Sequence, residues 1–418
     1  MRGVRDVFRR SSLPAVIMVT TLVFSLLGCV RTAAQPTQPQ THFEQGNRAV
    51  GIPFEIIEGA IVVTATLNDS VEVKLFFDTG FGSSGVLLHD PEMGSRMALN
   101  YVSTVDLGGG GTEGAKTADV AAAVKISLPG VTFPAENAIV LRKPDSLLTG
   151  MIVDGIIGGT LTRSVVEIDY DQSAINLYDR SVFQPDPDAT EHPVFFSYGI
   201  PVIDGAIEIE EGKPVPVKLL LDTGAPLMEV MVFTWPEPHF RPNGPTMEFV
   251  GRGMGGDVTV QYGRIRSLRL GKYKFENATA TFTDSTAYGT ATVLGQNGML
   301  GHETLRRFNV VLDYAGSRVF LKPNRRFDHV CEVEMTGITS KPLKNGYHKV
   351  FRIRADSPAA TQDVRIGDLI VEVDGRDVRT VPFEELYRTL TRDGASVTLT
   401  LERGSERLQR TLALRRQI

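Results

Sequence analysis

At 418 residues the chain is long enough for about two to four domains with their own cores, and its apolar content of 42% is ordinary for a globular protein. The formal net charge of −5 excludes the strongly basic footprint of nucleic-acid-binding proteins, so we expect no nucleic-acid partner. Glycine and proline separate short runs rich in Val, Ile, Thr and Phe, which predicts a mainly β fold.

The start of the chain is predicted to be a targeting segment. Four arginines form a basic head, and residues 13–27 are apolar but too short to span a membrane comfortably. This stretch ends in Leu26-Leu27-Gly28-Cys29, which resembles the lipobox of bacterial lipoproteins. The resemblance implies a signal peptide over residues 1–28, lipid on the Cys29 thiol and a membrane-anchored, exported protein.

By the same resemblance, Val30 after the cysteine implies the periplasmic face of a bacterial outer membrane. Plain secretion without lipid is the alternative. With Cys29 lipidated, only Cys331 remains as a thiol, so we expect no intramolecular disulfide. Residues 29–47 are rich in Pro and Gln near their start and are predicted to be a flexible tether.

A first lobe is predicted for residues 48–180. Its residues 61–66 and 71–75 have the composition of strands and flank Asn68-Asp69, which predicts a hairpin. Further strands are expected at 118–128, 138–141, 165–170 and 174–178. Residues 181–193, with Pro185-Asp186-Pro187-Asp188, are predicted to be an interlobe linker.

A second lobe, residues 194–326, repeats this plan. Strands are expected at 200–209, 215–221 and 258–262, and a hairpin at 309–321. The order of elements in the two predicted lobes is the same.

The last part of the chain, residues 330–418, has a different pattern. Residues 371–375 alternate and end in Asp-Gly, which is typical of a hairpin. Phe383, Leu386, Tyr387 and Leu390 lie on one face of a predicted helix. Together with Ser-Pro-Ala at 357–359 and Arg-Ile-Gly-Asp-Leu-Ile at 365–370, this pattern closely resembles a PDZ domain, a small α+β fold.

The PDZ resemblance implies a ligand peptide as partner and a peptide groove between that helix and the second strand. It also implies a carboxylate-binding loop near Gly337 and Ile338. The residues of this loop depart from the usual Gly-Leu-Gly-Phe, which leaves open whether it captures a free C-terminus.

Two copies of one short sequence motif contain the candidate catalytic residues. Residues 75–80 read Leu-Phe-Phe-Asp-Thr-Gly, and residues 219–224, 144 positions later, read Leu-Leu-Leu-Asp-Thr-Gly. Three more landmarks recur in the same order: glycine clusters at 108–111 and 251–256, apolar glycine segments at 155–159 and 298–301, and Asp-Tyr at 169–170 and 313–314. This repetition indicates a duplicated lobe. Because a buried strand that ends in an unpaired carboxylate is costly, we expect Asp78 and Asp222 to meet.

Two carboxyl groups that meet cannot both ionise easily, so the pair is expected to share one proton. The ionised partner then takes a proton from a water molecule that attacks a peptide carbonyl, and the protonated partner donates a hydrogen bond to the carbonyl oxygen. This chemistry uses no covalent intermediate, cofactor or metal.

The neighbours of the two acids fit this task. Gly80 and Gly224 allow backbone amides to approach the carboxylates. Thr79 and Thr223 carry hydroxyls that can bond across the lobe interface and fix its geometry.

Both halves resemble aspartic proteases of the retropepsin-like kind, in which Asp-Thr-Gly, a glycine-rich flap and an apolar-apolar-Gly segment follow one another. The resemblance covers about residues 54–325. It implies two β-barrel lobes that form an aspartic-type endopeptidase of peptide or protein substrates, with Asp78 and Asp222 as catalytic acids. It also implies mobile flaps that carry Gly109, Gly110, Gly253 and Gly255.

Two residues depart from the family pattern. Phe81 follows the first triplet where the family has a small residue, whereas Ala225 follows the second, and Pro226 is unusual so near the site. These residues either narrow the cleft or mark a weakened enzyme.

The sequence also contains patterns that suggest other functions. Residues 80–85 and 251–256 match Gly-x-Gly-x-x-Gly, but a dinucleotide site needs a helix next, and neither following segment reads as one. We find no Gly-x-Ser-x-Gly elbow, and the seven histidines lack paired metal-ligand spacing. The remaining alternative is a lipid-anchored peptide-binding sensor or scaffold with an inactive protease body, and the two complete triplets favour the enzyme.

Overall fold

The structure is a computed structural model that describes residues 41–143, 152–197, 199–234, 240–242, 244–284 and 296–418. Cys29, the predicted signal peptide and most of the predicted tether lie outside these residues. No helix in the described ranges is long and apolar enough to cross a membrane. The described part is mainly β, which confirms the fold class predicted from the sequence.

The first copy of the repeat holds strands β1 to β11. Its elements are β1 (His42–Phe43), β2 (Arg48–Ile57), β3 (Ala60–Leu67), β4 (Val71–Phe77), β5 (Val86–Leu88), α1 (Glu92–Arg96), β6 (Tyr101–Leu107), β7 (Lys116–Leu128), β8 (Val131–Leu141), β9 (Gly155–Ile157), η1 (Gly159–Arg163), β10 (Val165–Asp169) and β11 (Ala174–Tyr178). Asn68 and Asp69, between β3 and β4, have φ of 47° and 56°, the left-handed backbone of a tight hairpin turn.

The second copy holds strands β12 to β23. Its elements are β12 (Thr190–Ser197), β13 (Ile200–Glu208), β14 (Pro214–Leu221), β15 (Val230–Phe233), β16 (Met247–Gly253), β17 (Gly256–Arg264), β18 (Ser267–Leu270), β19 (Tyr273–Glu276), β20 (Thr279–Thr283), β21 (Gly298–Leu300), α3 (His302–Leu305), β22 (Phe308–Asp313) and β23 (Arg318–Pro323).

Strands β4 and β14 occupy equivalent places in the two copies. In β4, Val73, Leu75 and Phe77 are buried while the residues between them are less so, because alternate side chains of a strand point to opposite faces. Strand β9 pairs in parallel with β4 and antiparallel with β5, and β21 pairs in the same way with β14 and β15. Each of these two strands ends one residue before the aspartate of the repeated Asp-Thr-Gly motif.

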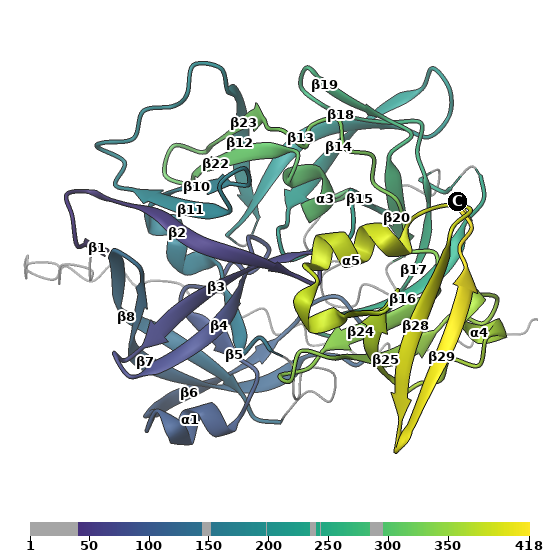
Figure 1. Ribbon diagram of the computed structural model, residues 1–418. Coiled ribbons are helices and arrows are strands. Elements are labelled where there is room, and N and C mark those ends of the chain that lie inside the picture. The colour runs from purple at the N-terminus through teal and green to yellow at the C-terminus, as the bar shows by residue number, and fades with distance from the viewer. Residues whose placement is uncertain (1–40, 144–151, 198, 235–239, 243, 285–295) are drawn as a thin grey trace, which may run out of the picture. The chain divides into compact units, whose positions relative to one another are not determined.

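One sheet joins the two copies. Its strands follow the order β2, β11, β10, β22, β23, β12, and the join is the antiparallel pair β10–β22, with Ile168 opposite Val310. Figure 1 shows β10, β11, β22 and β23 next to one another. Backbone hydrogen bonds thus hold the two copies together, and one apolar core contains residues of both.

The C-terminal part has its own sheet and core. Its elements are β24 (Ile338–Pro342), β25 (His348–Ile353), α4 (Pro358–Thr361), β26 (Leu369–Val373), β27 (Arg376–Asp377), η3 (Val378–Thr380), α5 (Phe383–Leu390), β28 (Ser396–Arg403) and β29 (Glu406–Ala413). The sheet order is β24-β25-β26-β28-β29, and β27 pairs with β26. The predicted Asp374-Gly375 turn and the predicted helix are present, and Leu386 of α5 is buried in a core that is separate from the first.

Two connecting segments are shorter than the sequence predicted. The tether was expected to run to residue 47, but His42 and Phe43 pair with β8, and Phe43 packs against the main core. The interlobe linker was expected to run to residue 193, but β12 begins at Thr190 and pairs with β23. In both cases an available strand edge and a buried side chain extend the fold into a segment that composition alone assigns to a loop.

The structure shows which strand of the C-terminal part lies at the sheet edge, and the predicted peptide groove stays a prediction. The second strand of this part, β25, lies between β24 and β26, and it pairs with β26 at His348 and Lys349. The strand that follows the predicted carboxylate loop is β24, at the edge of the sheet. An added strand needs a free edge, and β24 is the edge strand next to the predicted carboxylate loop.

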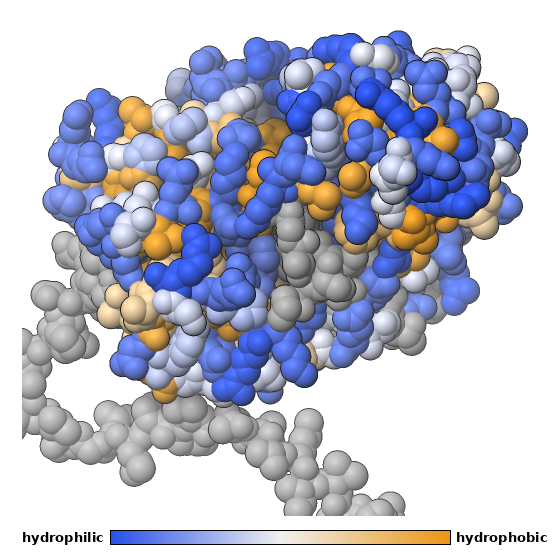
Figure 2. Space-filling model, turned by 60° about the horizontal axis from the view of Figure 1, so that its bottom comes forward, coloured by the Kyte–Doolittle hydropathy of each residue, from blue (hydrophilic) through white to orange (hydrophobic). Residues whose placement is uncertain are grey.

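The surface is largely polar with separate apolar patches. The face in Figure 2 shows hydrophobic residues scattered among hydrophilic ones. Among the described residues, three of the large exposed apolar side chains lie on β6, namely Tyr101, Val102 and Val105. Strand β6 pairs only with β7 in the described part, so it is a sheet edge that is open on one side.

Candidate active site

The repeated strands deliver Asp78 and Asp222 to equivalent positions. The amide of Asp78 donates to the carbonyl of Ile157 at 2.9 Å, and the amide of Asp222 donates to that of Leu300 at 3.0 Å. Each aspartate therefore continues the parallel pairing of its strand with β9 or β21, and its position follows from the strand register.

The two threonines bond across the join between the copies. The amide of Thr79 donates to Oγ1 of Thr223, and the amide of Thr223 donates to Oγ1 of Thr79, both at 3.0 Å. Thr79 Oγ1 also donates to the carbonyl of Leu221 at 2.7 Å, and Thr223 Oγ1 donates to that of Phe77 at 2.8 Å. Both side chains are buried, so this reciprocal set fixes the separation of the two strand ends.

The two glycines leave room for the carboxyl groups. A Cβ placed on Gly80 would lie 2.8 Å from Cγ of Asp222, and one on Gly224 would lie 2.4 Å from Cγ of Asp78. In addition, the amides of Gly80 and Gly224 donate to Oδ1 of their own aspartates at 2.7 and 2.8 Å. Each carboxyl group thus lies over the backbone of the opposite copy, which no other residue type would permit.

Burial raises the pKa of both carboxyl groups, and the proximity of Asp78 raises that of Asp222 further. Burial is the largest cause for Asp222, followed by the charge of Asp78 and the hydrogen bond between the two side chains, and the pKa of Asp222 lies well above 3.8. Burial also raises the pKa of Asp78, while the hydrogen bond from Asp222 and the amides of Gly80 and Phe81 oppose the rise. A proton that is shared between two close carboxyl groups accounts for this pattern.

The predicted flap glycines meet at the tips of two hairpins. Gly109 and Gly110 follow β6, and Gly253 and Gly255 lie at the turn between β16 and β17. The amide of Gly255 donates to the carbonyl of Gly110 at 2.8 Å, and a Cβ on Gly253 would lie 2.3 Å from that same oxygen. The backbones of the two hairpins therefore touch each other directly at these glycines.

The flap tips also place a residue that the sequence analysis missed. Met254 packs with Phe81 against an apolar cluster of the first copy that includes Leu87 and Ile139. A Cβ on Gly109 would lie 2.7 Å from Cβ of Met254, so the first hairpin needs glycine where the second inserts its methionine. Met254 stands 144 positions after Gly110, and a comparison of the two glycine clusters would have identified this difference.

The predicted PDZ residues lie at the start of β24, within the C-terminal part. Gly337 has φ of +78°, and its carbonyl accepts from the amide of Arg354 at 2.9 Å. Ile338 packs against the core of that part. Both residues belong to the C-terminal part of the chain, whereas Asp78 and Asp222 belong to the two copies of the repeat.

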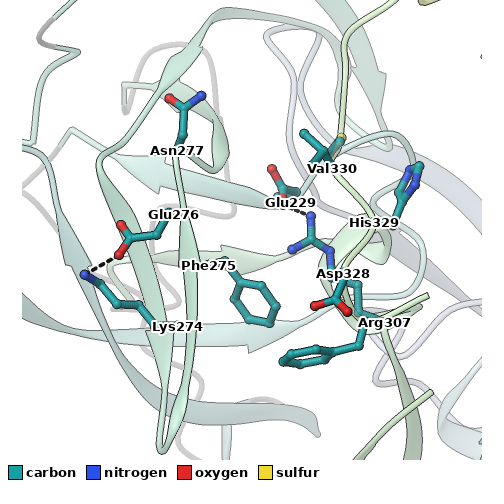
Figure 3. A pocket seen from close by; sticks show the side chains of 11 residues that line it. Glu229, Lys274, Phe275, Glu276, Asn277, Arg307, Asp328, His329 and Val330 are labelled. Carbon is teal, nitrogen blue, oxygen red and sulfur yellow. Dashed lines mark hydrogen bonds and ion pairs between the residues drawn. The ribbon is translucent and has the colours of Figure 1, made fainter. Parts of the chain in front are cut away.

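A buried ion pair that the sequence analysis also missed supports the second copy. Arg307 Nη2 lies 2.5 Å from Oε1 of Glu229, and Thr279 donates its amide and its hydroxyl to the other carboxylate oxygen. Figure 3 shows the guanidinium of Arg307 directed at Glu229 on the wall of a pocket of about 190 Å³. Asp222 precedes Glu229 by seven residues, so this pair anchors the segment between the candidate acid and β15.

The structure bears on two rival interpretations, a dinucleotide site and a metal site. The segments after both Gly-x-Gly-x-x-Gly matches are strands, β5 and β17, rather than the helix that a dinucleotide site requires. In the residues that the structure describes, no three His, Cys, Asp or Glu side chains are grouped so as to hold a metal ion.

Two family models match parts of the chain. A family model described as an aspartyl protease matches residues 206–304, which include Asp222, and one described as a PDZ domain matches residues 350–403. A comparison with curated proteins finds no match. A solved aspartic proteinase from Irpex lacteus aligns with a TM-score of 0.43 and 13% identity, over 68% of this chain and 99% of that chain. The protein therefore carries an aspartyl protease domain and a PDZ domain.

Proposed function

We propose that this protein is an aspartic endopeptidase in which Asp78 and Asp222 form the catalytic pair. The observation that carries the proposal is the meeting of two half-buried carboxyl groups across the reciprocal threonine bonds, with a raised pKa for each. A binding protein has no need to bury two acids against each other, because their mutual repulsion costs free energy.

In this proposal each residue of the site has a task. The ionised member of the pair takes a proton from a water held between the carboxyl groups, and that water attacks the peptide carbonyl carbon. The protonated member donates a hydrogen bond to the carbonyl oxygen as negative charge develops there, and a proton then passes to the leaving nitrogen. Thr79 and Thr223 hold the carboxyl groups in position, and the flap hairpins cover an extended substrate and exclude bulk water.

Digestion of a mixed peptide library by the full-length protein tests this proposal. We expect cleavage that persists with a chelator and with a serine-protease inhibitor. The rate should fall on both sides of a pH optimum: at high pH the pair loses its shared proton, and at low pH it gains a second one. Since the pKa of Asp222 is raised, the loss at high pH should occur above the ordinary carboxyl range. A library left intact would favour the peptide-binding scaffold, and cleavage abolished by the chelator would contradict the aspartate mechanism.

The cleft is expected to discriminate between side chains on its two sides. Phe81 from the floor and Met254 from the flap both pack in the first copy, whereas the residues at their equivalent positions are the small Ala225 and Gly110. Met228 of the second copy is the reverse case, because the equivalent residue of the first copy is the smaller Ser84. One of the two residues that flank the cleaved bond should therefore be small.

Phe81→Ala and Met254→Ala should relax this preference. For substrates with Leu or Phe at the restricted position we expect kcat/KM to rise roughly tenfold or more, while the preference at the other flanking position stays unchanged. Sequencing of the cleaved library products provides the measurement. Equal changes at both positions would contradict this account of the cleft.

We propose that the PDZ domain binds an extended segment and raises the concentration of substrate near the cleft. We also propose that Cys29 carries a lipid that anchors the protein in a bacterial outer membrane, facing the periplasm. A lipid-sized mass and detergent partition that are both lost in Cys29→Ser would support the anchor, and an unmodified soluble mature protein would rule it out.

A further inference from the structure

The loop before β24 already holds a carboxylate of its own chain. Oε2 of Glu334 accepts from the amide of Thr336 at 2.9 Å, from the Thr336 hydroxyl at 2.5 Å and from the amide of Gly337 at 3.0 Å. The amide of Ile338 donates to the Thr336 hydroxyl at 3.1 Å. Successive amides that converge in this way form a concave site for an anion, and here the Glu334 side chain fills it.

Contacts with the rest of the domain fix this loop. The amide of Met335 donates to the carbonyl of Leu390 at the end of α5, and the amide of Ala359 in α4 donates to the carbonyl of Thr336, both at 3.0 Å. A Cβ on Gly337 would lie 2.0 Å from Cβ of Ser357, so this position admits only glycine. The Glu334 carboxylate is therefore part of a packed structure, and a ligand would meet it in place.

Strand β24 provides the neighbouring surface. In the described part its residues Ile338 to Ser340 pair on one side only, with β25, and their side chains are half-buried. The unpaired backbone groups of such an edge can bond an extended polypeptide that adds as a further strand. A chain that adds along β24 passes the Glu334 site at one end of the strand.

We propose that β24 binds internal extended segments of a polypeptide and does not capture free C-termini, because Glu334 occupies the amides that a terminal carboxylate would need. A second carboxylate at this place would lie beside the first, and two close carboxylates repel each other. An internal segment brings no such charge and can continue past the loop. This inference rests on the proposed peptide-binding role of the PDZ domain, and it is independent of whether the aspartate pair hydrolyses peptides.

Binding to full-length protein tests the proposal. The Asp222→Asn form prevents cleavage, and the probes are random decapeptides synthesised once with a free C-terminal carboxylate and once as the C-terminal amides. We expect the affinities of each acid and amide pair to agree within about twofold. Glu334→Ala frees the Thr336 and Gly337 amides, and we then expect the free carboxylate to be favoured by roughly tenfold, as for a charge-assisted hydrogen-bond site.

Glu332→Ala is the matched control. Glu332 precedes Glu334 by two residues, but its carboxylate pairs with Arg264 and Arg416 and not with the loop amides. It should leave acid and amide peptides equal. A parent protein that prefers the free carboxylate, or that binds neither set, overturns the proposal. If Glu334→Ala fails to fold, the comparison on the parent alone still decides.

Discussion

Replacing Asp222 with asparagine is expected to lower kcat/KM for peptide hydrolysis by a factor on the order of 10³ or more. Asparagine keeps the shape of the side chain and can still accept from the Gly224 amide, which donates to Asp222 Oδ1 at 2.8 Å. It can neither share a proton with Asp78 nor deliver one to the leaving nitrogen. Asp78→Asn should have an effect of the same order, because neither acid works without the other. Initial rates on a peptide from the digested library provide the measurement.

A loss of stability would not account for this result. Burial raises the pKa of Asp222, so the folded protein binds its proton more tightly than the unfolded chain does. The parent therefore loses stability as pH rises above about 3.8, and Asp222→Asn escapes this loss. At pH 7 we expect the variant to have an equal or higher free energy of unfolding. Asp69→Asn, at an exposed position in the β3–β4 turn, should leave the rate unchanged. Unchanged cleavage in either Asp78→Asn or Asp222→Asn would remove the proposed assignment.

The meeting of the two acids was predictable because the sequence repeats the device that brings them together. An apolar strand that ends in Asp-Thr-Gly occurs twice at one offset, and Thr79 and Thr223 bond each other at that same separation of 144 residues. Strand periodicity and turn residues are local, so the strands that carry the acids could be read directly from the chain. The pairing of β10 with β22, which joins the copies, has no local signal and appears only in the structure.

The features that were missed depend on the course of the backbone or on contacts between distant residues. Met254 looks like an ordinary turn residue until the second hairpin reaches the first copy. Glu334 looks like a surface acid until the backbone turns and its carboxylate meets the next amides. The strands β1 and β12 lie in segments that composition assigns to connections, because a strand that completes an existing sheet edge needs little sequence signal of its own.

Removal of Arg307 is expected to have the largest effect on stability. Arg307 as a whole is 6% exposed. Its guanidinium bonds Glu229 at 2.5 Å and lies 4.7 Å from the ring centre of Phe275. Arg307→Met preserves much of the volume but leaves a buried carboxylate without its cation. A broken buried ion pair typically costs about 3–5 kcal/mol of unfolding free energy. Denaturant unfolding of the full-length protein provides the measurement.

Two further variants separate the lost charge pair from lost packing. Glu229→Gln combined with Arg307→Met removes both charges, so it should recover part of the free energy that Arg307→Met loses. Arg163, 144 residues before Arg307, pairs with Glu136 at 2.7 Å, but its side chain is 32% exposed. Water can partly replace that cation, and Arg163→Met should therefore cost less than Arg307→Met. Equal losses for the two arginines, with no recovery in the double variant, would show that Arg307 stabilises the fold through its packing on Phe275 alone.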